Sequence, residues 1–141
     1  MVKITDIERG GGRGTFFIRS MEDYNQLQKR LAENRWRDTP LKSVSIHQFM
    51  DGIPASMVVC VTRHGVLASS LQRQLMDLPY CKNFEEDGVF CGHAWGLPLW
   101  SATVRKSAFE QACQIGEFLG DMGYKGILGI DFIVHEGDRQ V

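Results

Sequence analysis

The last apolar stretch of the chain, Gly-Ile-Leu-Gly-Ile-Asp-Phe-Ile-Val from Gly126 to Val134, decides the expected fold. Its β-branched and aromatic residues predict a strand, and the polar turn His-Glu-Gly-Asp follows at residues 135–138. Asp131 lies inside this otherwise apolar run. Because side chains alternate along a strand, its carboxylate should point to the face opposite Ile130 and Phe132. An unpaired buried carboxylate is costly, so Asp131 should meet solvent, a cation or a metal ion.

The elements that precede this strand predict an α+β fold. Residues 103–122 form an amphipathic helix, with Gly123 suited to its end. A second helix covers about residues 21–34, with Ser20 and Asp23 placed as a capping box. Strands are expected at residues 2–4, 15–18, 44–50, 56–62, 66–71 and 89–91, and the rest of 75–100 is expected to be mostly loop. The sequence thus predicts a mainly antiparallel sheet, partly a meander, with helices packed on one side.

The composition narrows the class of protein. The 141 residues suit about one domain, and 43% hydrophobic with 23% charged residues is ordinary for a soluble protein. A net charge of −1 argues against a nucleic-acid partner, and no apolar run suggests a membrane span or signal peptide, so we expect a cytoplasmic protein. The four cysteines form no C-x-x-C pair, which favours buried reduced thiols over zinc ligands or disulfides.

A glycine cluster near the start of the chain is the first candidate site. It consists of Gly10, Gly11, Gly12, Arg13 and Gly14. Glycines let several backbone N–H groups approach one anion, and the arginine adds a cation suited to phosphate oxygens. A flexible hairpin turn explains the same residues equally well. The cluster is not a P-loop, because no Gly-Lys-Ser/Thr follows and a strand, not a helix, comes next.

Two further segments are candidates. Gln48, Phe49 and Met50 lie on a predicted strand whose flat side chains and backbone edge could hold an adenine, although such a segment is more often ordinary core. Asp131 would suit Mg²⁺, which takes one or two carboxylates together with phosphate oxygens. An aspartate on the wet face of a sheet is the simpler interpretation when this residue is considered alone.

The order of these features along the chain resembles an ATP-grasp domain. The resemblance covers nearly the whole chain and is closest to the biotin carboxylase and carbamoyl-phosphate synthase branch. It implies that Gly10–Gly14 is the loop that closes over the triphosphate, with Arg13 near its tip. It also implies that Lys3 reaches the phosphates, that Gln48–Met50 is a hinge holding the adenine, and that Asp131 is the first of two acidic metal ligands.

The resemblance also implies an organisation and an activity. Residues 1–45 would be part of the small ATP-grasp lobe, and 46–141 part of the large lobe, truncated before the strand with the second metal ligand. ATP and Mg²⁺ would be the cofactors, and a small, unidentified carboxylate would be activated as an acylphosphate by a ligase or synthetase. This chain alone is not expected to turn over. Whether the fragment self-associates through a surface that truncation would expose is left open.

Two alternatives remain open at this stage. His47 stands where the family commonly has glutamate, which favours a non-catalytic module that binds a nucleotide or a partner on the same scaffold. The other alternative is an unrelated α+β domain whose glycine turn binds nothing.

Overall fold

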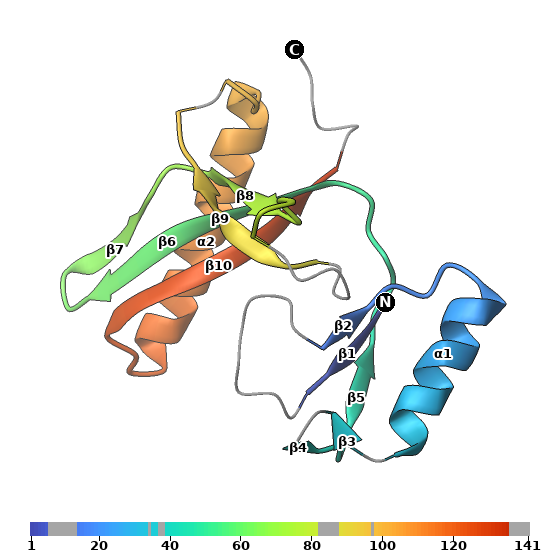
Figure 1. Ribbon diagram of the computed structural model, residues 1–141. Helices are drawn as coiled ribbons and strands as arrows, with labels where there is room; N and C mark the ends of the chain where they lie inside the picture. Colours follow the sequence, from blue (N-terminus) through green and yellow to red (C-terminus); the bar gives the residue numbers. More distant parts are fainter. Residues whose placement is uncertain (6–13, 34, 37–38, 82–87, 97, 136–141) are drawn as a thin grey trace. The chain divides into compact units, whose positions relative to one another are not determined.

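The computed structural model describes residues 1–5, 14–33, 35–36, 39–81, 88–96 and 98–135 (Figure 1). The chain divides into two compact units. Unit 1 comprises Met1–Phe49 and Met76–Cys91, and unit 2 comprises Met50–Leu75 and Gly92–Val141. The assignment of residues 1–45 and 46–141 to the two ATP-grasp lobes stays a prediction.

Unit 1 contains a three-stranded antiparallel sheet in the order β2-β1-β5 (Figure 1). Its strands are β1 (Val2–Ile4), β2 (Thr15–Phe16) and β5 (Val44–Ile46). The unit also contains the helix α1 (Met21–Ala32) and a pair of two-residue strands, β3 (Arg35–Trp36) and β4 (Thr39–Pro40).

The start of α1 follows from its sequence. The Ser20 side chain accepts a hydrogen bond from the Asp23 backbone N–H at 3.1 Å, and Asp23 Oδ2 accepts one from the Ser20 N–H at 2.9 Å. Two of the N–H groups that the helix end leaves unpaired are satisfied in this way. The predicted capping box is therefore confirmed.

Unit 2 is built on one long strand, β6 (Ile53–Thr62). The strands follow the order β10-β6-β8-β9, and β7 also pairs with β6. The other members are β7 (Gly65–Ala68), β8 (Gln72–Met76), β9 (Phe90–Ala94) and β10 (Gly126–Val134); Met76, Phe90 and Cys91 belong to unit 1 in the division of the chain. The pairs that β6 makes with β7, β8 and β10 are all antiparallel.

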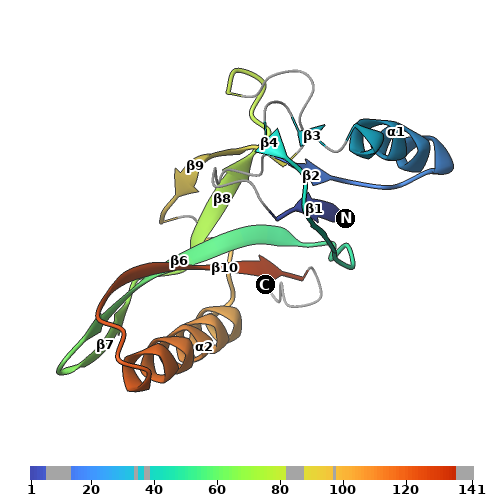
Figure 2. The ribbon, with the colours of Figure 1, turned by 90° about the horizontal axis from the view of Figure 1, so that it is seen from below.

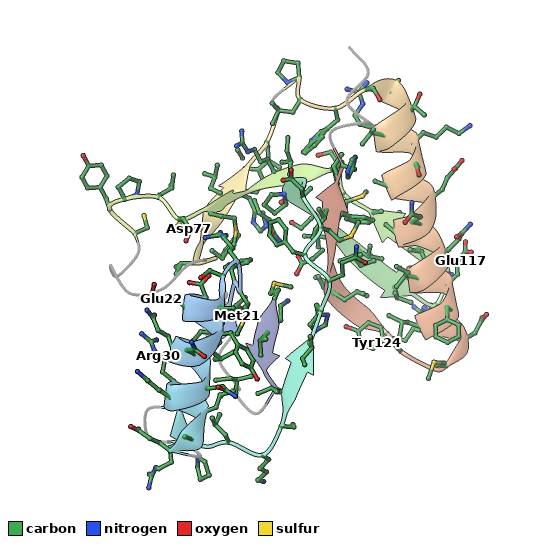
Figure 3. The ribbon with its side chains drawn as sticks, turned by 90° about the vertical axis from the view of Figure 1, so that its right-hand side faces the viewer. Met21, Glu22, Arg30, Asp77, Glu117 and Tyr124 are labelled. Carbon is green, nitrogen blue, oxygen red and sulfur yellow. The ribbon has the colours of Figure 1, made fainter. Side chains whose placement is uncertain are left out.

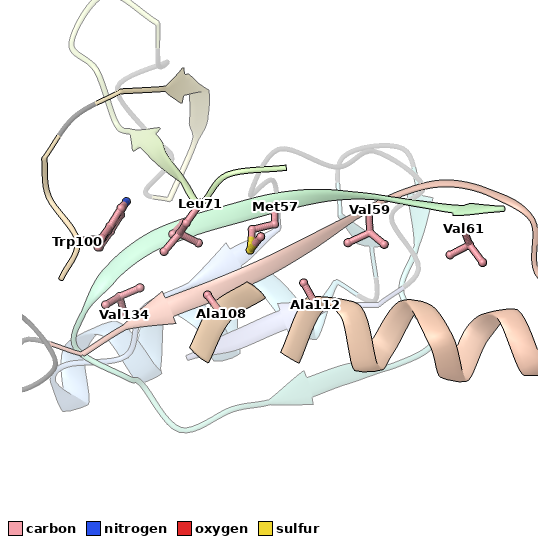
Figure 4. Packing of buried hydrophobic residues seen from close by; sticks show 9 residues of the cluster. Met57, Val59, Val61, Leu71, Trp100, Ala108, Ala112 and Val134 are labelled. Carbon is pink, nitrogen blue, oxygen red and sulfur yellow. The ribbon is translucent and has the colours of Figure 1, made fainter. Parts of the chain in front are cut away.

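The helix α2 (Ala102–Asp121) covers one face of this sheet (Figure 2). Alternate residues of β6, Met57, Val59 and Val61, are at most 3% exposed and pack towards Ala108 and Ala112 of α2 (Figure 4). The partly buried Leu128, Ile130 and Phe132 of β10 join the same cluster. The core of unit 2 thus lies between α2 and the sheet, and the intervening residues of β6 and β10 belong to the opposite face.

The observed elements confirm the predicted α+β class with antiparallel sheets. β10 has the predicted bounds, and α2 is within one residue of them. The prediction of a strand over 44–50 is wrong beyond Ile46, because the partner strand β1 begins at Val2 and, among the described residues, only the Met1–His47 pair adds backbone bonds there. The strand predicted over 66–71 is confirmed as β7 only as far as Ala68, and the next strand, β8, begins at Gln72, where no strand was predicted.

Two further expectations concern the cysteines and membrane-spanning segments. All four cysteines are free, which agrees with reduced thiols, but the expectation that they are buried is wrong: Cys81 is exposed, and the other three are only half-buried. Among the described residues, no helix has both the length and the apolar character needed to cross a membrane.

Candidate functional site

A polar row crosses the face of the unit 2 sheet that α2 leaves uncovered. Ser56 on β6 lies directly opposite Asp131 on β10 and opposite Gln72 on β8. Residues opposite each other in antiparallel strands place their side chains on the same face. Three strands therefore bring one carboxylate, one hydroxyl and one amide together.

Gln74 joins this row through a hydrogen bond to Asp131. The Gln74 side chain donates from Nε2 to Asp131 Oδ1 at 2.7 Å. Since an ionised carboxylate only accepts hydrogen bonds, the amide must present its N–H₂ group. At this distance the bond is of the short, charge-assisted kind.

His93 also lies at the row. Ser56 Oγ and His93 Nε2 are 2.8 Å apart, which satisfies a serine that is only 5% exposed. His93 belongs to β9, which extends to Ala94, so the expectation that the strand ends at residue 91 and that loop follows is wrong. The His93 and Trp95 ring centroids are 6.1 Å apart, so an aromatic ring stands beside the polar row.

The carboxylate of Asp131 fits a metal ion that is shared with phosphates. Asp131 is exposed, and among the described residues its Oδ2 has no hydrogen-bonding partner. The described residues contain no group of three or more His, Cys, Asp or Glu suited to a metal. A lone carboxylate would not build an all-protein cage, but it is what Mg²⁺ commonly takes when phosphate oxygens complete its shell.

The carboxylate of Asp77 makes an instructive contrast. Its two oxygens accept the backbone N–H groups of Gly88 and Val89, each at 3.0 Å. These bonds close the base of the segment between β8 and β9, at the position labelled in Figure 3. Asp77 is thus committed to the backbone, whereas Asp131 retains an accessible oxygen.

Lys3 lies on a polar face of the unit 1 sheet. It is exposed and pairs with Thr15 of β2 and Ser45 of β5, which places the three side chains on one face. Ser45 Oγ is 2.8 Å from His47 Nε2. This face therefore gathers a cation, two hydroxyl groups and an imidazole, which are suited to an anion.

The segment Gln48–Met50 is exposed and belongs to no strand. The Phe49 ring meets that of Phe17 edge to face at 5.8 Å, and the Arg19 guanidinium lies 5.4 Å from the centre of the Phe17 ring. The division between the two units falls between Phe49 and Met50.

Most of the predicted glycine loop lies outside the described residues, namely Gly10, Gly11, Gly12 and Arg13. Gly14 is described and buried, and its φ of 75° is the left-handed conformation that glycine adopts without strain. Its carbonyl accepts the Ile4 N–H at 3.0 Å, which ties the end of the loop to β1.

The structure adds residues that the sequence did not single out: Ser45, Ser56, Gln74 and His93. The alternation of Gln72-Arg73-Gln74 is the only sequence signal for Gln74, and no strand was predicted where β8 lies. Ser56 was placed at the start of a predicted strand, with nothing in the sequence to indicate that His93 would reach it.

Comparisons with known proteins give one informative result. No family model matches the chain, and no curated protein does. Among solved structures, carboxyaminoimidazole ribonucleotide synthase from Aspergillus clavatus, in complex with ATP, is similar over 97% of this chain at a TM-score of 0.63 and 17% identity. The similar region is 31% of that protein, so the chain spans about a third of its length. The likeness does not point to the biotin carboxylase and carbamoyl-phosphate synthase branch in particular.

Proposed function

Because the chain has the fold of part of an ATP-grasp enzyme, we propose that it is the ATP-binding part of a Mg²⁺-dependent carboxylate ligase or synthetase. The observation that carries the proposal is the likeness of fold over 97% of the chain to a synthase solved with ATP. The exposed carboxylate on the uncovered face of the unit 2 sheet gives it chemical support.

Each candidate residue has a role in this proposal. Asp131 would hold Mg²⁺ through its accessible oxygen, and Lys3 would contact phosphate oxygens from the polar face of its own sheet. The backbone of Gln48–Met50 would hold the adenine, and the Phe49 ring, held edge to face by Phe17, would pack beside it. Gly10–Gly14 and Arg13 would cover the phosphates.

The chemistry would be activation of a carboxylic acid by transfer of the terminal phosphoryl group to form an acylphosphate. Bound Mg²⁺ would neutralise charge on the phosphate oxygens during the transfer. The residues of this chain would contribute positioning and charge complementarity, which supply most of the catalysis in phosphoryl transfer. The acid and the nucleophile that displaces the phosphate are not identified by these residues.

A second candidate function is a nucleotide-binding module without catalysis. His47, which occupies the position where the family commonly has glutamate, favours it. The imidazole bonds to Ser45, and the backbone of His47 pairs with Met1 in both directions. An imidazole would thus replace the carboxylate beside the proposed hinge, Gln48–Met50. The backbone of Gln48–Met50 would still be available to hold an adenine.

A thermal-shift titration tests the proposal with the whole chain. Binding to the folded state alone should raise the free energy of unfolding by about 2.7 kcal/mol when ATP is present at a hundredfold excess over its Kd. We expect this stabilisation with ATP and Mg²⁺, a smaller one with ATP alone, and a smaller one with GTP and Mg²⁺.

The substitution Asp131→Ala should remove the Mg²⁺-dependent part of the stabilisation. Asp121→Ala, which removes an exposed carboxylate at the end of α2, is the matched control and should leave it intact. Equal stabilisation with and without Mg²⁺ would favour the non-catalytic module. No response to any nucleotide in the wild-type chain would contradict both candidate functions.

A further inference from the structure

We propose that Gln74 is a positioning residue that orients the Asp131 carboxylate for a bound divalent cation. The inference rests on the proposed function, because it assigns Gln74 a part in Mg²⁺-dependent binding of ATP. Gln74 is not itself a ligand in this proposal. Its amide holds one carboxylate oxygen and thereby directs the other.

The hydrogen bond spans an intervening strand. Gln74 is on β8 and Asp131 on β10, and β6 lies between them in the sheet. The register places Ser56 of β6 opposite both Gln72 and Asp131, so Gln74 reaches Asp131 diagonally across β6. Gln74 is two residues from Gln72 on the same strand, so its side chain belongs to the same face of the sheet as Ser56 and Asp131.

The bond restricts a carboxylate that would otherwise be free to rotate. Asp131 is exposed, and Gln74 is its hydrogen-bonding partner in the described part of the chain. With Oδ1 held at 2.7 Å from Gln74 Nε2, the plane of the carboxylate and the direction of Oδ2 are fixed before a cation arrives. Partners that hold metal ligands in this way typically contribute about 10- to 100-fold to metal affinity.

The geometry of the sheet supports the role of Gln74 as a positioning residue. The backbone of β8 is held by pairing with β6, and Gln74 is itself half-buried, so its side chain starts from a constrained position. A site residue mounted on a strand is placed more precisely than one mounted on a loop.

The test compares the affinity for ATP in excess Mg²⁺ with the affinity for ATP in EDTA, both by isothermal titration calorimetry on the whole chain. The variant Gln74→Leu removes the donor and keeps a side chain of similar size. We expect its Kd for ATP in Mg²⁺ to rise about tenfold while its Kd in EDTA stays at the wild-type value. A purely structural loss would weaken both affinities together.

The variant Gln111→Leu provides a matched control. Gln111 is an exposed glutamine of α2 whose amide donates to Ser107 Oγ at 3.0 Å, and it lies on a different element from the row. This variant should reproduce both wild-type affinities. A difference between the two variants then reports the position of the amide, not the loss of an amide in general.

A second measurement follows the bond without any nucleotide. In an NMR spectrum of the wild-type chain, the Gln74 side-chain amide protons should be shifted downfield, and this shift should disappear in Asp131→Ala. An unchanged amide signal in that variant would contradict the bond on which the inference depends.

The outcomes separate this inference from the proposed function. If the wild-type chain binds ATP more tightly with Mg²⁺, Asp131→Ala loses that gain and Gln74→Leu keeps it, the positioning role is overturned and the proposed function stands. Equal weakening in Mg²⁺ and in EDTA also overturns the positioning role. If the wild-type chain binds ATP in neither buffer, the proposed function fails and the inference fails with it.

Discussion

Three carboxylates of this chain differ in the hydrogen-bond donors that surround them. Asp77 and Asp23 accept hydrogen bonds from backbone N–H groups, at the base of a loop and at the start of a helix. Asp131 accepts from a side chain and retains an accessible oxygen. The same residue type therefore serves structure in two places and is suited to a ligand in the third.

The carboxylate of Asp23, which caps α1, should make the stability of the first turn of that helix depend on pH. Hydrogen bonds from the Arg19 backbone N–H and from Ser20 lower the pKa of Asp23. A carboxyl group whose pKa is lower in the folded state stabilises that state above its unfolded pKa of about 3.9, and this contribution is lost as the pH falls through the folded pKa. We expect the first turn of α1 to fray below about pH 4, as followed by NMR chemical shifts.

Substitution of the two acidic residues in that turn provides the control. Asp23→Asn should remove the pH dependence of the first turn. Glu22→Gln should leave it in place, because Glu22 accepts neither backbone bond at the cap. Fraying that survives in Asp23→Asn would show that another group titrates.

At the scale of elements, α2 approaches the sheet closely through small residues. Ala108, Ala112 and Gly116 are spaced four residues apart and are all buried. A Cβ atom at Gly116 would lie 2.7 Å from Val66 Cγ1 and 2.9 Å from Val59 Cγ1, closer than real contacts allow. Both neighbours are valines, which are stiff at χ1 and yield little.

The close approach predicts the effect of a larger residue. Gly116→Val should lower the free energy of unfolding by about 2 kcal/mol, because overpacking costs about 1–3 kcal/mol and exceeds the gain in helix propensity. Glu117→Val introduces the same side chain on the outer face of α2, labelled in Figure 3, and should cost less than about 1 kcal/mol. Urea unfolding measures both, and equal effects would contradict the packing argument.

At the scale of the whole molecule, the two units differ in the size of their cores. In unit 2, nine buried hydrophobic residues form one cluster. Among the described residues of unit 1, only Ile4 and Leu27 are buried hydrophobic side chains. Since buried apolar surface is the main stabilising contribution, unit 2 should be the more stable of the two.

Native-state hydrogen exchange tests this difference. Amides paired between β6 and β10 should exchange most slowly, and those of β1 and β2 faster. Met57→Ala, which truncates a side chain that is 1% exposed, should cost about 2–5 kcal/mol and reduce protection in β6 and β10. Equal protection in both units of the wild-type chain would contradict the ranking.

The sequence by itself determined the elements whose signals are local. The capping box at Ser20, the apolar face of α2 and the β-branched run of β10 each depend on residues close together in the chain, so they were predicted almost to their ends. The alternation that turns Asp131 away from the core was predicted for the same reason. The order of these elements was enough to indicate the ATP-grasp fold.

Only the tertiary structure decided which polar side chains meet. Gln74 and Asp131 are 57 residues apart, and Ser56 and His93 are 37 apart. Their contacts depend on the order β10-β6-β8-β9 and on the register of β6 with its neighbours. A shift of one residue in that register would move each side chain to the other face, and no local pattern specifies which strands pair.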